Sequence, residues 1–413
     1  MHALWERKLK TPDTYDYTFD LSGSMFNEKG ASKKLTVNTI SSLAHSFTPY
    51  IEHEVERRLI DPIKQQTIVA NSPAIIWYKD NLLLVSRIWL VREKYEAKKN
   101  WPSNDFYDNI LYTQTFDSNM SPITSGKFLG IPSPKQFWVG DGPIEPRLFE
   151  FKGEAYVSFN VAMALSRKVS VDSTVLWNYN RDIPIFPKIT GGSPILRDLK
   201  NSGMKRDKHW MSLTYKDNLY FIHSLDPLRV LQCDGLPLKA DCKFIHQEKL
   251  QDGFRDYAIH LRGGTPFLSY KQPYYISIVH NTLFKERTSK RFYTAHLVVL
   301  SVEPIWRIVY ISDPIKLNSE IYESSPLERP LYIEEDFIFP VGLTIDTPDS
   351  ILIGAHANDH SAIIIRLRGI RELMNNVIES DDSEKGPKAG IIQEYIHDRI
   401  ELTTNMRFIH EKS

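Results

Sequence analysis

Apolar and polar positions alternate in short runs along most of this chain, and the runs come in pairs. One pair starts at Ile144, where the run "IEPRLFEF" is followed by the polar turn "KGE" and the run "AYVSFNVAM". Alternation of this kind is typical of a β-strand with one buried face, and Gly, Asn or Asp between two such runs is typical of a hairpin turn. The pattern therefore predicts a β-hairpin that begins at Ile144.

The same unit of strand, turn and strand occurs five times, each time after a small or proline-containing start. The five units begin at Asn71, Ile144, His209, Gly263 and Phe339, at intervals of roughly 55 to 75 residues. A propeller repeat is typically about 40 to 50 residues long, so these intervals fit decorated blades. We predict an all-β fold, a five-bladed β-propeller with short helical N- and C-terminal extensions. A β-sandwich is the alternative, but it would not explain five copies of one unit.

The two flanks of the repeat have a helix-like pattern. Residues 42–66 show helical spacing of apolar and charged positions broken by two prolines, and "LRGIRELMNNVIES" from Leu367 is similar. We expect three regions: a partly helical N-terminal extension (1–66), the propeller as the catalytic domain (67–370), and a C-terminal extension that packs on it (371–413). The helical flanks are also candidate elements of a homodimer.

Composition and charge limit the partners. The chain is 42% hydrophobic and 25% charged, which is ordinary for a soluble globular protein. Lys plus Arg and Asp plus Glu both total 51, so no long-range field would attract nucleic acid or an anionic membrane. Nowhere do 18 consecutive apolar residues occur, and the N-terminus has no apolar signal-like core. The sequence predicts no nucleic-acid partner and no transmembrane segment.

Two cysteines, Cys233 and Cys242, are present, in neither a zinc nor a redox spacing. This predicts that the fold is not a disulfide scaffold and holds no structural zinc. A reducing compartment, the cytoplasm, is the expected location. The lumen of the secretory pathway is the alternative if an upstream anchor precedes this sequence.

Polar side chains gather where the predicted blades begin and at nearby strand ends. The set is rich in cations and poor in carboxylates, which suits a ligand that carries phosphate. Its members are Arg87, Asp141, Glu145, Arg147, Arg197, Lys208, His209, His223, Arg262, His280, Tyr293, His296, Asn358 and Asp359.

Glu145, with Asp141 as a substitute, is the candidate catalytic acid. Inverting glycoside hydrolysis usually needs two carboxylates. If phosphate attacks or leaves, one carboxylate is enough, because it only has to protonate the leaving sugar oxygen or take the proton of an acceptor hydroxyl.

Several of these residues also have structural explanations. A proline after an acid often marks only a turn, and Arg147 could pair with Glu145 or Asp141. His223, His280 and His296 lie in apolar strand patterns, where a hydrogen-bonded core histidine is the commoner case. The chain has no P-loop, dinucleotide-binding glycine fingerprint, HExxH or GxSxG motif, and we therefore expect no cofactor.

Four segments, in this order and spacing, resemble the blades of the five-bladed propeller enzymes that make or break β-mannosides. These enzymes are the inverting mannoside phosphorylases and the β-1,2-mannosyltransferases, and the chain is more similar to the glycosyltransferase-like branch. The resemblance spans Asn71 to Leu367. The segments are "GPIEPRLFEFKGEAYVSFN", "DKHWMSLTYKDNLYFIHSLDPLRVLQC", "RGGTPF" with "IVHN", and "AHANDHSAIIIRL".

The resemblance implies a role for each candidate residue. Glu145 stands where the family has its catalytic Asp before Pro-Arg, and is longer by one methylene. Arg197, Lys208 and His223 correspond to the phosphate- or donor-binding cations. Arg147 orients Glu145, and the family needs neither metal nor cofactor for sugar transfer. The substrate-binding set would be Arg87, Arg147, Arg262, His280, Tyr293, His296, Asn358 and Asp359.

We therefore expect a glycosyltransferase that forms β-mannosidic linkages, β-1,2 among them, by an inverting mechanism with a single carboxylate. Its partners would be a sugar donor, either a nucleotide sugar or a sugar 1-phosphate, and an oligosaccharide acceptor. An inverting β-mannoside phosphorylase or hydrolase is the first alternative. A propeller that binds a glycan without catalysis is the second.

Overall fold

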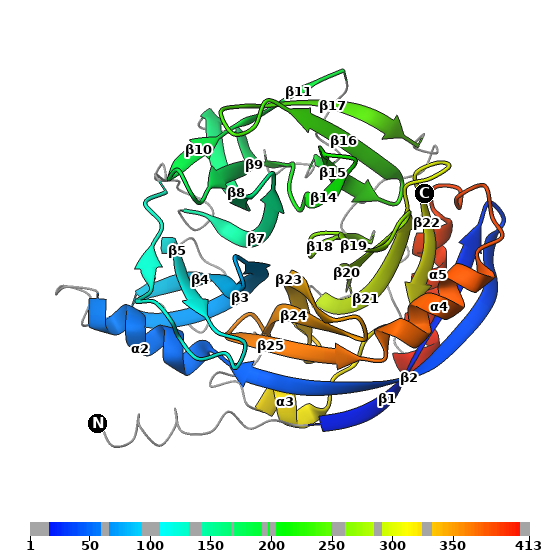
Figure 1. Ribbon diagram of the computed structural model, residues 1–413, viewed down its shortest axis with the longest axis horizontal. Coiled ribbons are helices and arrows are strands. Elements are labelled where there is room, and N and C mark those ends of the chain that lie inside the picture. The colour runs from blue at the N-terminus through cyan, green and yellow to red at the C-terminus, as the bar shows by residue number, and fades with distance from the viewer. Residues whose placement is uncertain are drawn as a thin grey trace.

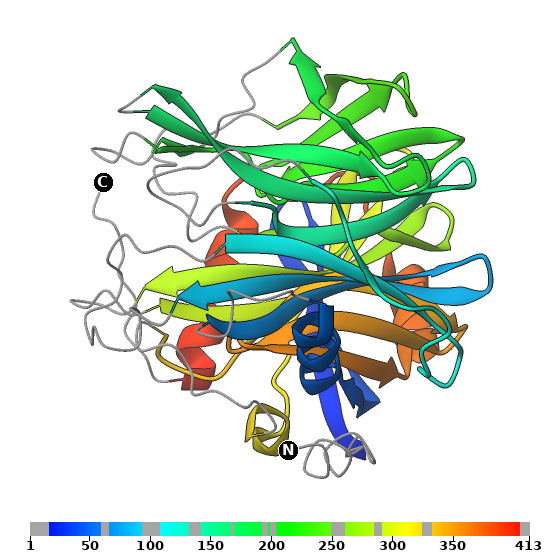
Figure 2. The ribbon, with the colours of Figure 1, turned by 90° about the vertical axis from the view of Figure 1, so that its left-hand side faces the viewer.

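The strands of the protein surround a central axis (Figure 1). Seen from the side, they run from one face of the molecule to the other (Figure 2). The computed structural model describes residues 16–58, 66–92, 108–131, 142–166, 169–191, 197–198, 204–248, 261–284, 291–323 and 333–404. This is an all-β propeller, and the predicted fold class is confirmed.

Three separate sheets form one side of the ring. The first contains β3 (Gln66–Tyr78), β4 (Asn81–Arg92), β5 (Asp108–Phe116) and β6 (Lys127–Phe128). The second contains β7 (Ile144–Phe151), β8 (Glu154–Ser166), β9 (Val169–Asn178), β10 (Ile183–Ile185), β12 (Arg197–Asp198) and β13 (Met204–Arg206). The third contains β14 (Met211–Tyr215), β15 (Asn218–Leu225), β16 (Leu228–Asp234), β17 (Ala240–Gln247) and β11 (Pro187–Thr190), which pairs in parallel with β17.

A ten-stranded sheet forms the other side of the ring. One half holds β18 (Arg262–Gly264), β19 (Leu268–Lys271), β20 (Tyr274–Phe284), β21 (Arg291–Ser301) and β22 (Arg307–Ser312). The other half holds β23 (Ile338–Thr347), β24 (Ser350–Ala357) and β25 (Ser361–Arg368). Between them lie β1 (Asp16–Asn27) and β2 (Gly30–Ser46), with β1 paired to β22 and β2 to β25. Each half is an antiparallel array of the kind that forms a blade, which is consistent with the five predicted units.

Two-residue turns create several of the predicted hairpins. Lys79 and Asp80 join β3 to β4, Lys152 and Gly153 join β7 to β8, and Lys216 and Asp217 join β14 to β15. All six residues have positive φ angles, between 46° and 77°. Two successive positive φ values define the turn type whose twist matches that of paired strands. The polar dipeptides between apolar runs therefore act as local hairpin signals.

The described part of the N-terminal segment contains the helix α2 (Thr48–Arg58), and it also contains strands that the sequence analysis did not predict. Residues 16–46 form the β1–β2 hairpin. Along β2, buried Leu35, Val37 and Thr39 alternate with exposed neighbours. This period-two pattern is that of a strand with one buried face. The hairpin completes the sheet on the outside of the ring, where β22 and β25 would otherwise have exposed edges.

Two C-terminal helices pack on the ten-stranded sheet and the sheet beside it, and a short helix, α3 (Ser319–Glu323), follows β22. Helix α4 (Ile370–Ser380) buries Leu373, Met374 and Val377 in the apolar cluster that also contains β1 and β21 residues. Helix α5 (Ile391–Thr404) buries Ile392, Ile396 and Ile400, spaced four residues apart on one face. None of the helices within the described ranges has the length and apolarity needed to cross a bilayer.

Cys233 on β16 and Cys242 on β17 lie opposite each other in register and form a disulfide. Disulfides persist mainly in oxidising compartments. The prediction of a reducing compartment therefore loses its support.

Two carboxylates, the buried Asp226 and the half-buried Glu248, fasten the end of the third sheet. Asp226 accepts hydrogen bonds from the backbone N–H groups of Gly390 and Gln393, at 2.7 and 2.9 Å, where α5 begins. Glu248 accepts one from the N–H of Leu228 at 2.7 Å. Burial raises the pKa of Asp226 to about 6 and that of Glu248 to about 7, and the backbone hydrogen bonds oppose this rise only in part.

Stability is expected to fall as the pH rises from about 4 to about 7. Both pKa values lie above those of the unfolded chain, so the folded state binds protons more tightly in this window, with an effect on the order of 2 kcal/mol per group. Urea unfolding across this range measures the fall. Glu248→Gln keeps an oxygen that can accept the Leu228 N–H but does not titrate, so it should reduce the fall in stability near pH 7. Glu372→Gln, on the exposed face of α4, should leave that fall unchanged. A flat wild-type profile would contradict this account.

Candidate active site

The first strand of each array lies nearest the central axis, as Figure 1 shows for β3, β7, β14, β18 and β23. Among these strands, β7 is bulged at its start and β3 near its middle. In β7 the register shifts between Ile144 and Arg147, and in β3 between Asn71 and Ala74. Glu145 and Ser72, each followed by a proline, have positive φ angles of 52° and 48°. Such backbone is strained in residues other than glycine and is frequent at functional sites, as are bulges.

The Glu145 carboxylate is held by two nitrogen groups from the neighbouring sheet. Lys208 Nζ donates to Oε1 at 3.0 Å, and His209 Nε2 lies 2.8 Å from Oε2. Both residues directly precede β14. The Glu145 side chain is 14% exposed, so the carboxylate is largely buried but reachable. We call Glu145, Lys208 and His209 the acid cluster.

Neighbouring charges decide the protonation of Glu145, whereas burial decides that of His209. Burial alone would raise the pKa of Glu145, but His209, Lys208 and Arg147 together outweigh it and hold the pKa well below its ordinary value. Burial lowers the pKa of His209 well below its ordinary value, against the opposing effect of Glu145. At neutral pH the carboxylate is therefore ionised and the His209 ring is neutral.

Arg147 holds the backbone of the site. Its guanidinium donates to the backbone oxygen of Glu145 at 2.9 Å and to that of Gly264 on β18. Burial lowers the pKa of Arg147 to about 10, although Glu145 opposes this change. Arg147 therefore fixes the β7 bulge and ties it to β18. The contact between Arg147 and Glu145 is thus made to the backbone of Glu145, and the predicted orienting role stays a prediction.

His209 is placed by a close approach to β18. A Cβ atom at Gly263 would lie 2.0 Å from His209 Cβ, so no side chain fits there. The Gly263 oxygen also lies 2.5 Å from Nδ1 of His280, whose ring centre is 5.1 Å from that of His209 and 4.2 Å from that of Phe339. The absence of a side chain at Gly263 thus allows the rings of His209, His280 and Phe339 to pack together beside the Glu145 carboxylate.

Gly263→Ala is expected to reduce the rate of a reaction that depends on Glu145 by roughly a hundredfold. The added methyl group must push His209 away from Glu145, and a shift of about 1 Å in a catalytic site can lower the rate this much. The matched control is Gly130→Ala, where the added Cβ meets nothing within 4 Å. Initial rates and thermal melts of both variants would be compared. Full activity of a folded Gly263→Ala protein would show that the His209 contact is dispensable.

Some buried polar atoms on β3 and β20 have no hydrogen-bond partner among the described residues. They are Nε2 of His280, both amide atoms of Asn281, Oδ1 of Asn71 and Oγ of Ser72. Buried polar groups are normally paired, and an unpaired one costs free energy. These atoms are suited to bind the hydroxyl groups of a ligand.

Among the other predicted residues, Arg87 and Arg262 lie on strands, and Asn358 and Asp359 lie in the turn between β24 and β25. Arg87 donates to Asn109 Oδ1 at 2.7 Å, and Arg262 donates to Thr282 Oγ1 at 3.0 Å. Asp359 lies 3.4 Å from His356 Nδ1. Asn358 accepts from the N–H of Phe337 and donates to Asp336, which suggests a positioning role.

Two predicted histidines already have protein partners. His296 uses both ring nitrogens, with Thr294 Oγ1 at 2.8 Å and the Ser312 oxygen at 2.9 Å, and is a core histidine with none left for a sugar. His223 Nε2 lies 2.9 Å from Asp207, which also accepts from Trp210. His223 therefore braces the segment that carries Lys208.

The remaining predictions have different outcomes. Asp141 lies outside the described residues, and Arg197 is described only as part of the backbone of β12. His209 had no assigned role from the sequence, although its position beside Lys208 was a usable signal. In the described part of the chain, no group of three or more His, Cys, Asp or Glu residues is arranged to hold a metal ion.

The sequence is similar to β-mannosyltransferase 2 of Komagataella phaffii, with 22% identity over 328 residues. The match covers 71% of this chain and 49% of that protein, so the chain spans about half the length of the curated relatives it matches. No family model matches. The expected resemblance to the β-mannosyltransferases is confirmed.

Two solved structures are more distant. One is a structure from the GH130 family of mannoside phosphorylases, with a TM-score of 0.45, 11% identity, and coverage of 73% of this chain and 85% of that one. The other is MPT-1, a GDP-Man-dependent mannosyltransferase from Leishmania mexicana, with a TM-score of 0.43, 12% identity, and coverage of 76% and 92%. At these TM-scores neither likeness supports a further conclusion.

Proposed function

We propose that this chain, which is similar to the β-mannosyltransferases, is an inverting glycosyltransferase that forms β-mannosidic linkages. The observation that supports this most is the acid cluster: a single ionised carboxylate on a strained bulge, held between Lys208 and His209. The domain boundaries and a homodimer stay predictions.

In the proposed reaction Glu145 acts as the general base. It takes the proton of an acceptor hydroxyl while that oxygen attacks the anomeric carbon of the donor. The bond from the anomeric carbon to the phosphate oxygen breaks, and the phosphate leaves with the electron pair. The unpaired polar atoms of Asn281, His280, Asn71 and Ser72 would bind sugar hydroxyls.

Lys208 would serve both the carboxylate and the donor. It contacts Glu145 directly, whereas the sequence predicted that it holds donor phosphate. A long lysine side chain can turn from one anion to another. If Lys208 moves to the donor phosphate, its positive charge no longer lowers the pKa of Glu145. The carboxylate then becomes a stronger base at the step in which it takes the proton of the acceptor hydroxyl.

Lys208→Met is expected to move the acidic limb of the pH–rate profile to higher pH, by about one to three units, because an opposite charge near the carboxylate is lost. Lys216→Met is the control, since this lysine is exposed and pairs with Glu303. The measurement is kcat/KM for transfer as a function of pH, because kcat/KM reports the groups of the free enzyme, in which Lys208 contacts Glu145. An acidic limb that stays in place would show that Lys208 does not act on the catalytic carboxylate.

The activity itself is tested with a panel of nucleotide sugars and sugar 1-phosphates, with mannose and short mannosides as acceptors and product detection by mass spectrometry. Product from a nucleotide sugar would support transfer. Product from a sugar 1-phosphate alone would indicate a phosphorylase working in reverse, which needs the same single acid. A folded protein that binds mannosides but forms no product with any donor would contradict the proposal and favour a glycan-binding propeller.

A further inference from the structure

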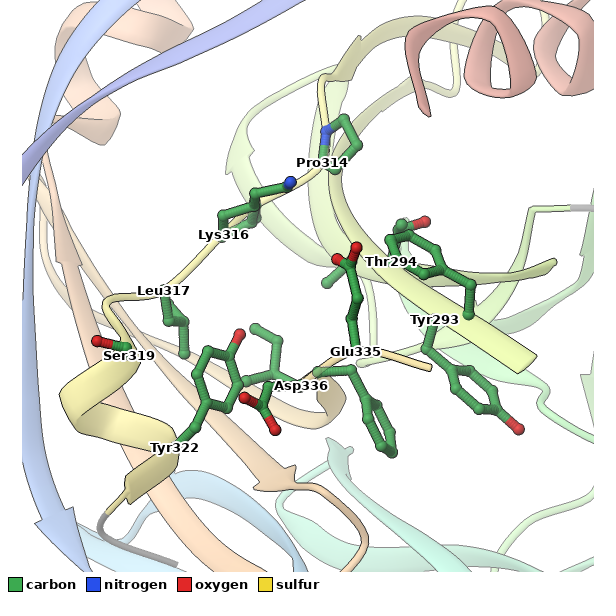
Figure 3. Close-up of a pocket in the computed structure, with 14 residues that line it drawn as sticks. Tyr293, Thr294, Pro314, Lys316, Leu317, Ser319, Tyr322, Glu335 and Asp336 are labelled. Atoms are coloured by element: carbon green, nitrogen blue, oxygen red, sulfur yellow. The ribbon is translucent and has the colours of Figure 1, made fainter. Parts of the chain in front are cut away.

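A separate pocket of about 300 Å³ lies between β21, helix α3 and the start of β23 (Figure 3). Figure 3 shows Lys316, Tyr322, Glu335 and Asp336 around this space. None of the three acid-cluster residues lines it. The pocket is therefore a second site, formed where the two halves of the ten-stranded sheet meet.

A continuous row of rings connects this pocket with the acid cluster. Tyr293, which lines the pocket, stacks on Phe337 at 4.8 Å between ring centres and lies 6.3 Å from Phe339. Phe339 in turn lies 6.1 Å from His209, which contacts Glu145. Because Phe337 and Phe339 are buried, these rings form a packed row between the pocket and the acid cluster.

The topology places both sites at the same end of the strands. Residues 335–337 lead into β23 just as Lys208 and His209 lead into β14. Asp336 also accepts a hydrogen bond from Asn358 at 2.9 Å, so the pocket wall is tied to the turn between β24 and β25. A ligand in the pocket would thus lie at the same end of the strands as the acid cluster.

The chemistry of the lining favours a neutral sugar. Glu335, Asp336, Ser319 and Tyr322 offer carboxylate and hydroxyl oxygens, and aromatic side chains supply faces for a ring. Two carboxylates against one lysine disfavour a phosphate. The volume is at the lower end of the range of about 300–1,000 Å³ typical of small-molecule sites, which suits a short sugar segment better than a nucleotide sugar.

We propose that this pocket binds a neutral sugar unit of the acceptor, away from the hydroxyl that is to be glycosylated. The pocket would then set a preference for longer acceptors over mannose. This inference rests on the proposed function, because it assigns the acceptor side of that reaction.

The test measures binding apart from catalysis. Calorimetry with mannose and β-mannosides of two to four units would use the Glu145→Gln protein without a donor, so that turnover does not interfere. We expect the longer mannosides to bind more tightly than mannose. Glu335→Ala, which removes two hydrogen-bond acceptor oxygens, and Ser319→Trp, which fills the pocket, should each reduce that advantage roughly tenfold or more. Glu150→Ala is the control, since Glu150 is exposed on β7 outside the pocket.

The outcomes separate the two proposals. An advantage of longer mannosides that both pocket variants retain would overturn the pocket assignment and leave the proposed transfer intact. Loss of the advantage in both variants would support the assignment, even if the wild type forms no product with any donor. Failure of every mannoside to bind would overturn it.

Discussion

Glu145→Gln is expected to lower the rate of sugar transfer by about 10²–10⁴-fold, because a positioned acid–base group contributes this much. Glutamine has nearly the same shape as glutamate but cannot take the proton of the acceptor hydroxyl. It also removes the negative charge that Lys208 and His209 contact. Initial rates with the productive donor measure the loss, and circular dichroism with thermal melting shows whether the fold is kept.

Two further variants make this result specific. Glu150→Gln, an exposed position on the same strand, should keep wild-type activity. Glu145→Asp keeps a carboxylate but withdraws it by about 1.5 Å, and should lose roughly a hundredfold because both contacts of the acid cluster are broken. A Glu145→Gln protein within a few-fold of wild type would refute the role of Glu145. A more active Glu145→Asp protein would show that the site suits the shorter acid of the related enzymes.

Asp381→Ala is expected to lower the free energy of unfolding by about 3–5 kcal/mol, because it leaves a buried charge without its partner. Asp381 binds Arg307 through two hydrogen bonds, at 3.0 and 2.5 Å, and accepts a third from Tyr274 at 3.0 Å. The side chains of Arg307 and Asp381 are 3% and 2% exposed. This pair fastens the end of α4 to β22, so its loss should also release the C-terminal helices.

Denaturant unfolding of Asp381→Ala beside Arg57→Ala tests the energetic distinction between buried and exposed pairs. Arg57 is 60% exposed and pairs with Glu54 within α2, so its loss should cost about 0.5 kcal/mol or less. Equal effects of the two substitutions would contradict the structural role given to the buried pair.

Most of the local structure follows from the sequence, because its causes are local. Alternation of apolar and polar residues depends on the period-two geometry of a strand, and turns such as Lys79–Asp80 need only two residues with positive φ. The same alternation runs through Leu35, Val37 and Thr39, so β2 was also within reach of the sequence. Its pairing with β25 was not, because β25 lies more than 300 residues further along the chain.

The sequence by itself determined which residue types stand where the inner strands begin, and it placed Glu145 and Lys208 among them. Only the tertiary structure decided their partners. Lys208 and Glu145 are 63 residues apart and meet because two neighbouring sheets pack together. Packing also directed Arg147 to backbone oxygens and satisfied both nitrogens of His296 within the core. Contacts between blades depend on how whole sheets are arranged around the axis, and no local pattern in the sequence records that arrangement.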